Sequence, residues 1–406
     1  MLASEFRFGG ARGPQWQRDY NLFEGGDMKR IVGRRGVRNT SAAVAVALTG
    51  ALSLMTGLVS TGAAGATSAH SATALLSTSV HPPTFNDSKL FAIRNALSNA
   101  MKGKSLSSVN TWMVVNILAT YWVAGKQGDA QAAKELGIAA HYEGPPQGQL
   151  ATQVSEYESL TSTGATGFFT SVIDPVSEGS LLTKAQSKGI DVVAIDSPVP
   201  ASDAKTFTYI GTPNVTAGQA AGEAMKKALP NGGDVAILTG SLTATNALQR
   251  IQGFKQALAG SKVKVVATEN DNGVAATASS NASAVIASNA NLKGIYGVYS
   301  YDGPAGSVAV KAKGDTGKIW VVADDNEPGT ITGLQNGTVA ASIIQQPFMQ
   351  GYLGAYVTAA MKVLGAAKVK SLIAPDLTGG VISTGVGTLT KANLSQDLAY
   401  NKAIGA

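Results

Sequence analysis

Acidic, amide and aromatic side chains follow the ends of several short apolar segments that predict β-strands. Asp196 and Asp325 stand out, because each comes just after such a segment and at equivalent positions in the two halves of the chain. A carboxylate accepts hydrogen bonds from two hydroxyl groups, and an aromatic ring covers an apolar C–H face. These side chains therefore favour a neutral, hydroxyl-rich small ligand, and they could equally enclose an ammonium group. The strand-end candidates for ligand binding are Tyr121, Trp122, Asp196, Ser197, Asn246, Tyr301, Asp302, Asp325 and Gln345.

Some of these residues also have a purely structural interpretation. Asp302 and Asn246 stand where a helix N-cap is expected, a position that Asp and Asn favour. Tyr121 and Trp122 have the size and apolar area of core aromatics, since Trp and Tyr are usually largely buried. Sequence alone leaves both interpretations open for these four residues.

The sequence contains few residues that could form an enzyme active site. Its histidines are His70, His81 and His141, too scattered for a Ser-His-Asp site or a histidine metal cluster. There is no Gly-x-Ser-x-Gly elbow and no phosphate-binding Gly-x-x-x-x-Gly-Lys-Ser/Thr loop. The adjacent Asp324 and Asp325 suit a glycosidase poorly, because neighbours on a strand point in different directions. With zero cysteines as well, we expect no catalysis, no metal and no cofactor.

Short β-branched segments alternate with amphipathic ones from Val109 onward, the pattern of βαβ units and an α/β fold with parallel sheets. Ten strands, enough for two sheets of about five, are predicted over 111–115, 138–142, 167–172, 191–195, 206–210, 234–238, 263–268, 294–298, 318–322 and 340–344. Ligands of such sheets bind beyond the carboxyl ends of the strands, where the candidates lie.

The N-terminal part of the chain predicts export. Five basic residues between Lys29 and Arg38 precede an uncharged, apolar and small-residue segment, Ala42 to Ala66, which ends in a small-residue cleavage site. We interpret residues 1–66 as an export signal with Met28 as the better start, and 67–106 as a linker or decoration. The alternative for Ala42 to Val59 is a transmembrane anchor. Without a cysteine for lipidation, the exported protein is expected to diffuse freely in a periplasm.

Much of the positive charge belongs to that signal. Residues 1–66 hold eight of the 32 basic and four of the 26 acidic side chains, which leaves 24 basic and 22 acidic ones and a formal charge of +2. This small net charge therefore gives little electrostatic support for a nucleic-acid partner. The 340 remaining residues exceed a typical single core and predict two domains or lobes.

Three segments carry a resemblance to a known family: 167–196, 233–258 with its Arg250, Gly253 and Phe254, and 319–347. Over roughly 107–385 the chain resembles the ribose- and galactose-type periplasmic sugar-binding proteins, the type I solute-binding components of ABC importers. The resemblance implies two Rossmann-like lobes, 107–211 plus 346–376 and 212–345 plus 377–406. It implies a three-strand hinge near 211–213, 345–347 and 375–376, and it implies a monomer that delivers a small sugar or polyol to a membrane permease.

Carried over by position, the resemblance adds Asn116 to the ligand-binding residues and places Asp325 and Gln345 on the family's sugar-binding Asp and Gln. Two arginines of the ribose binders fall on Ser197 and near Leu248, so both guanidinium groups are expected to be missing. LacI-type repressors share the two-lobed core, but a helix-turn-helix would stand where the export signal stands. A ligand-sensing receptor for a chemoreceptor or sensor kinase remains an alternative to import.

Overall fold

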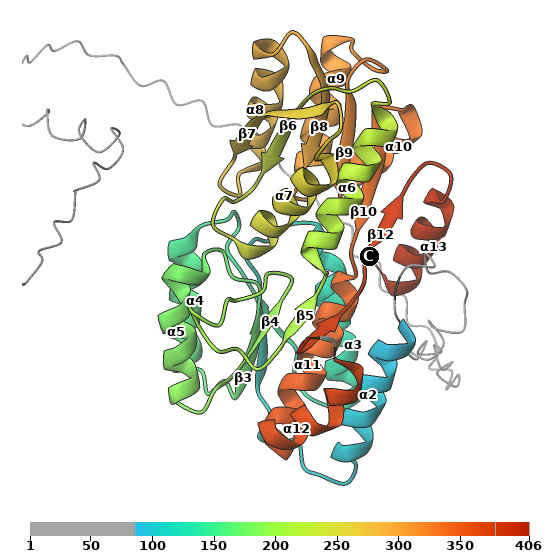
Figure 1. Cartoon of the computed structure of the whole chain (residues 1–406). Coiled ribbons are helices and arrows are strands. Elements are labelled where there is room, and N and C mark those ends of the chain that lie inside the picture. The colour runs from blue at the N-terminus through green and yellow to red at the C-terminus, as the bar shows by residue number, and fades with distance from the viewer. Residues whose placement is uncertain (1–84, 86, 378, 406) are drawn as a thin grey trace, which may run out of the picture. The chain divides into compact units, whose positions relative to one another are not determined.

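The computed structural model describes residues 85, 87–377 and 379–405, so the predicted export signal and residues 67–84 lie outside the described residues. Within that part, no helix has the length and apolar character to cross a membrane. Two six-stranded sheets dominate the fold (Figure 1), and each is covered by helices. We call the sheet that begins with β1, with its helices, the N-terminal lobe and the other the C-terminal lobe.

The N-terminal sheet is entirely parallel, in the order β11-β5-β4-β3-β1-β2. Its inner strands are mostly apolar because helices cover both faces, and Phe168 and Phe169 are fully buried. The strands are β1 (Thr111–Val114), β2 (His141–Glu143), β3 (Gly167–Thr170), β4 (Asp191–Ile195), β5 (Tyr209–Gly211) and β11 (Val381–Ser383). The helices are α2 (Asp87–Met101), α3 (Tyr121–Leu136), α4 (Leu150–Leu160), α5 (Pro175–Ser187), α11 (Pro347–Leu364), α12 (Ala366–Ile373) and η2 (Ala374–Asp376).

The C-terminal sheet repeats this topology in the order β12-β10-β9-β8-β6-β7, with β12 antiparallel to β10. In both sheets the strand order reverses beside the first strand, which is where open α/β sheets bind ligands. The strands are β6 (Gly233–Thr239), β7 (Val263–Asn270), β8 (Leu292–Gly297), β9 (Trp320–Asp324), β10 (Val339–Ile344) and β12 (Gly387–Leu389). The helices are α6 (Asn214–Ala228), α7 (Thr245–Leu258), α8 (Ala275–Ser288), α9 (Asp302–Lys313), α10 (Pro328–Asn336) and α13 (Leu394–Ile404).

Within the described residues, three segments lead from a strand of one sheet to the other lobe. The first two crossings lie after β5, around residues 211–213, and after β10, around residues 345–347, as predicted. The third was predicted at 375–376, but these residues belong to η2, and β11 still pairs with β5 in the N-terminal sheet. The crossing therefore falls at residues 384–386, between β11 and β12. Residues 377–383 had been placed in the wrong lobe because strands of three residues leave almost no periodic signal.

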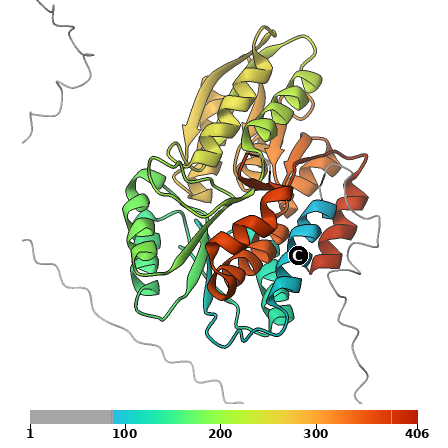
Figure 2. The same ribbon diagram turned by 60° about the horizontal axis from the view of Figure 1, so that its bottom comes forward.

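Part of the predicted linker belongs to the N-terminal core. Helix α2 occupies residues 87–101 and buries Leu90, Ile93 and Leu97, which pack with Tyr352 and Tyr356 of α11. These three side chains recur at helical spacing, so one face of α2 is apolar. Figure 1 shows α13 above the upper end of α2, and Figure 2 shows the same two helices from another side. Helix α13 reaches both cores, because Leu394 packs in the C-terminal lobe, and Tyr400 and Ile404 pack in the N-terminal lobe.

Candidate ligand-binding site

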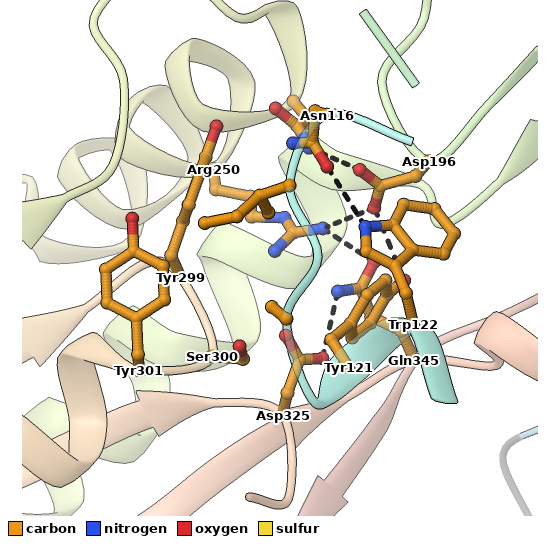
Figure 3. A pocket seen from close by; sticks show the side chains of 13 residues that line it. Asn116, Tyr121, Trp122, Asp196, Arg250, Tyr299, Ser300, Tyr301, Asp325 and Gln345 are labelled. Carbon is orange, nitrogen blue, oxygen red and sulfur yellow. Dashed lines mark hydrogen bonds and ion pairs between the residues drawn. The ribbon is translucent and has the colours of Figure 1, made fainter. Parts of the chain in front are cut away.

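Eight of the ten predicted ligand-binding residues line one cavity between the lobes. The cavity has a volume of about 30 Å³, which is enough to hold water. In Figure 3, Tyr121 and Trp122 lie on one side of this space, Tyr299 and Tyr301 lie on the other, and Arg250 lies between Asp196 and Asp325. The lining residues are Asn116, Ile117, Ala119, Tyr121, Trp122, Asp196, Asn246, Arg250, Tyr299, Ser300, Tyr301, Asp325 and Gln345.

Asp196 and Asp325 share an unusual backbone conformation. Asp196 follows β4 with φ of 56°, and Asp325 follows β9 with φ of 64°. Among the described residues other than glycine, only Asn272 joins them at positive φ. Side chains of L residues rarely adopt this left-handed conformation, and such strain gathers at functional sites. The equivalence that the sequence predicted for the two aspartates therefore extends to their backbone geometry.

Asp196 is the acceptor on the N-terminal side of the cavity. Its Oδ2 accepts hydrogen bonds from Ser171 Oγ at 2.8 Å and Asn246 Nδ2 at 3.0 Å, and its Oδ1 accepts one from Tyr121 at 3.3 Å. Burial raises the pKa of this carboxyl, and the nearby Arg250 and the hydrogen bonds oppose that shift. Asp196 is thus an acceptor with several donors around it. A ligand hydroxyl could donate to this carboxylate in the same way.

Asp325 occupies the corresponding position on the C-terminal side. Its Oδ1 accepts a hydrogen bond from Gln345 Nε2 at 2.9 Å, and its backbone N–H donates to Ile343 at 2.7 Å. Burial raises the pKa of Asp325 to about 7, against the opposing influence of Arg250 and Gln345. Gln345 stands on the second crossing and also accepts from Thr212 of the first crossing, at 2.8 Å. The carboxylate is therefore tied to two of the segments that join the lobes.

Its raised pKa makes Asp325 a source of pH-dependent stability. The unfolded carboxyl ionises near pH 3.9, so between about pH 4 and pH 7 the folded state holds a proton that the unfolded state has lost. Wild-type protein should therefore lose stability relative to Asp325→Asn as the pH rises through this window, by about 4 kcal/mol at most. Urea unfolding of both proteins at pH 5 and pH 8 measures the difference. An equal gap at the two pH values would contradict the assignment.

Arg250 was named as part of the resemblance but was not counted among the ligand-binding residues, although it lines the cavity. It is buried on α7, where Nη1 donates to Asp324 at 3.1 Å and Nη2 donates to Gln345 at 2.6 Å. Its Nη2 lies 3.8 Å from Asp196 Oδ1. Leu248, where the resemblance placed a lost arginine, is exposed instead. The expectation of no guanidinium group is therefore wrong.

The spacing of residues within α7 could have identified Arg250 as a candidate. Asn246 and Arg250 are four residues apart, which places them on one face of a helix, and Asn246 was already a candidate. The cavity therefore contains one guanidinium group, a rigid set of hydrogen-bond donors, beside the carboxylates of Asp196 and Asp325.

Two aromatic pairs form opposite walls. Tyr121 and Trp122 of α3 meet edge to face at 4.8 Å, and Trp122 donates through Nε1 to Asn116 Oδ1 at 3.0 Å. Tyr299 and Tyr301, from the segment between β8 and α9, meet edge to face at 6.0 Å. Trp122 is also part of the N-terminal core, so it is both a core aromatic residue and a part of the cavity wall. Rings on both sides suit a ligand with apolar faces.

Ser197 and Asp302 do not line the cavity. Ser197 is fully buried, where its Oγ accepts from the Asn246 N–H at 3.4 Å. Asp302 is the first residue of α9 and accepts from the Tyr299 N–H at 2.9 Å, behind the aromatic wall. Burial and the neighbouring Asp271 raise the pKa of Asp302 well above its usual range. The helix start turns this carboxylate toward its own backbone, so it supports Tyr299 rather than facing the cavity.

The lobes touch each other around the cavity. Asn246 of the C-terminal lobe donates to Asp196 of the N-terminal lobe, and the Gly148 N–H donates to the Gly273 carbonyl at 3.4 Å. A ligand that lies between the two aspartates has to replace the contact between Asn246 and Asp196. Within the described residues, no three His, Cys, Asp or Glu side chains are placed to hold a metal ion. Side chains in this arrangement can exchange hydrogen bonds with a small molecule that lies between the two lobes.

Comparison with known proteins agrees with this geometry. A family model described as a periplasmic binding protein domain matches residues 112–366. The chain belongs to this family. Members of the family are non-enzymatic solute-binding proteins, and relatives of this one are sugar-binding components of ABC importers.

Three relatives illustrate the similarity. An ABC transporter solute-binding protein from Burkholderia graminis, solved in complex with D-arabinose, is 31% identical, with a TM-score of 0.63 over 72% of this chain and 98% of that one. The ribose import binding protein of Haemophilus influenzae is 26% identical over 71% of this chain and 98% of its own. The D-allose-binding periplasmic protein of Escherichia coli is 27% identical over 58% of this chain and 78% of its own.

Proposed function

We propose that this periplasmic binding protein captures a small sugar or polyol between its lobes and delivers it to the membrane permease of an ABC importer. One observation carries the proposal: two aspartates in the same left-handed conformation, one from each lobe, line one cavity that also has an aromatic pair from each lobe. Carboxylates and one guanidinium group bind ring hydroxyls, and the rings cover C–H faces. The names of the relatives, which bind arabinose, ribose and allose, support a monosaccharide.

Capture requires the lobes to separate and close again. The crossings at residues 211–213, 345–347 and 384–386 would form the hinge, and helix α13, which packs on both lobes, would have to leave one of them as they separate. Closing would bring Asn246 and Arg250 to Asp196, with the ligand among them. The protein acts as a monomer, without a catalytic step, after residues 1–66 have directed its export and without a lipid anchor.

A thermal-shift screen of the chain from residue 67 onward tests this function. The panel compares pentoses, hexoses and polyols with small amines of similar size. A sugar or polyol at 100 times its dissociation constant should raise the free energy of unfolding by about 2.7 kcal/mol. Stabilisation by amines, with none by any sugar or polyol, would show that the carboxylates serve a cation instead.

A further inference from the structure

A second cavity adjoins the candidate site. It has a volume of about 380 Å³, which lies within the usual range of small-molecule pockets. It lies between α3 and α11 of the N-terminal lobe and the Asp325–Ile331 segment of the C-terminal lobe, and α13 borders it. We call it the side chamber. Tyr121, Asp325 and Gln345 line both the side chamber and the candidate site, so the two spaces share one wall.

Helix α13 is held in place by hydrogen bonds and packing, and it forms one wall of the side chamber. Asp397 is buried and accepts a hydrogen bond at 2.9 Å from Asn326, the residue after Asp325. Leu394 and Tyr400 pack into the cores of the two lobes. The helix is therefore held against the segment that carries Asp325, and its residues Leu398, Asn401 and Lys402 form one wall of the chamber.

Several of the apolar side chains that line the chamber are exposed to solvent. Val123 of α3 is 45% exposed and Leu398 is 41% exposed, and both belong to the few large apolar side chains that the described part of the chain leaves exposed. Ile331 and Phe348 add further apolar surface. Such a surface is stabilised when a ligand covers it.

Polar groups complete the lining. Asn326, Glu327, Asn401 and Lys402 offer carboxylate, amide and ammonium groups. Glu327 Oε1 accepts from Ser300 at 2.8 Å, and Ser300 itself lines the candidate site. An apolar wall with hydrogen-bonding groups beside it matches a ring that has one apolar face and a polar edge.

We infer that the side chamber is a second subsite, which holds the group attached to a sugar bound between Asp196 and Asp325. The ligand that uses both spaces is a glycoside: its sugar ring occupies the candidate site, and its second unit, another sugar ring or an aromatic group, passes Tyr121 and lies between Val123 and Leu398. This inference rests on the proposed function, because the first ring must be a sugar.

The test compares free sugars with their glycosides by titration calorimetry on the chain from residue 67 onward. The free sugars are D-arabinose, D-ribose, D-xylose, D-glucose and D-galactose, and each is paired with its 4-nitrophenyl glycosides and with disaccharides that contain it. At least one glycoside should bind about tenfold more tightly than its parent sugar, the gain that a modest apolar contact provides. A gain limited to 4-nitrophenyl compounds assigns an aromatic group to the chamber, and a gain limited to disaccharides assigns a second sugar.

A pair of variants ties that gain to the chamber. Val123→Trp places a large side chain in the chamber and should bring the glycoside's affinity to within about twofold of its parent sugar, while the parent sugar binds as before. Leu398→Trp does the same from the opposite wall and serves if the first variant folds poorly. Val308→Trp is the matched control, because Val308 is an exposed valine of α9 that does not line the chamber, and it should change neither affinity.

The outcomes separate the two proposals. If free sugars bind but every glycoside binds equally or more weakly, the subsite is wrong and the proposed function stands. If Val123→Trp weakens the free sugar and the glycoside alike, the chamber does not act as a separate subsite. If no sugar binds in any form, the proposed function fails, and the subsite fails with it.

Discussion

Replacing Asp325 by alanine should weaken sugar binding about 100-fold or more and leave the protein folded. Two hydrogen bonds from ligand hydroxyls to this carboxylate would be lost, and bonds to a charged acceptor contribute about 1.5–3 kcal/mol each. A 100-fold loss corresponds to about 2.7 kcal/mol. Stability at pH 8 should not fall much, because the substitution also removes a carboxylate whose pKa burial has raised to about 7.

Asp174 provides the matched control for that substitution. It also follows a strand and lies next to a helix, but its Oδ1 caps α5 by accepting from the N–H groups of Val176 and Ser177. Asp174→Ala should lower the free energy of unfolding by about 1 kcal/mol, the usual effect of a lost N-cap, with ligand affinity unchanged. Titration calorimetry and urea unfolding of both variants give the comparison. Normal binding by Asp325→Ala would remove Asp325 from the site.

Replacing Arg250 by methionine should produce the largest loss of stability among these substitutions, about 3–5 kcal/mol. Arg250 is 2% exposed, and its Nη1 lies 3.1 Å from Oδ2 of Asp324, which is 1% exposed. Without Arg250, the buried carboxylate of Asp324 loses its ion-pair partner, and Asn214 and Gln345 each lose a hydrogen-bond donor. Such an uncompensated buried charge is much more costly than the loss of a surface ion pair.

A double substitution separates the charge from the packing. Arg250→Met with Asp324→Asn should be more stable than Arg250→Met alone, because the second change removes the unpaired charge. Lys226→Met breaks the exposed ion pair with Glu223 and should cost no more than about 1 kcal/mol. Urea unfolding of the four proteins measures these differences. A loss below 1 kcal/mol for Arg250→Met would mean that Asp324 is not paired as the structure indicates.

Periodicity and strand-end position were enough to predict the α/β fold and most of the cavity. Asp196 and Asp325 could be found because each follows a mostly apolar strand, and such strands occur where both faces of a parallel sheet are covered. The short strands β11 and β12 were missed, since three residues do not establish a period of two. The residues of helix α2 were assigned to a linker or decoration although Leu90, Ile93 and Leu97 recur at helical spacing, because the segment before them is rich in Ser, Ala and Thr.

The remaining errors concern side-chain direction. Arg250 was not counted among the ligand-binding residues because the resemblance directed attention to Leu248, two residues earlier and on another face of α7. Asp302 satisfied the same strand-end rule as Asp325, but its carboxylate accepts from the Tyr299 N–H instead of facing the cavity. Strand-end position therefore identifies candidate residues, and the local hydrogen bonds of each loop decide which of them face a ligand.

The most direct test of this account is a crystal structure with the sugar or polyol that gives the largest thermal shift. The account predicts that its ring lies between Asp196 and Asp325, that its hydroxyls bond to both carboxylates and Arg250, and that the hydrogen bond from Asn246 to Asp196 at 3.0 Å is replaced by bonds to the ligand. A ligand bound away from both aspartates, with that hydrogen bond intact, would contradict it.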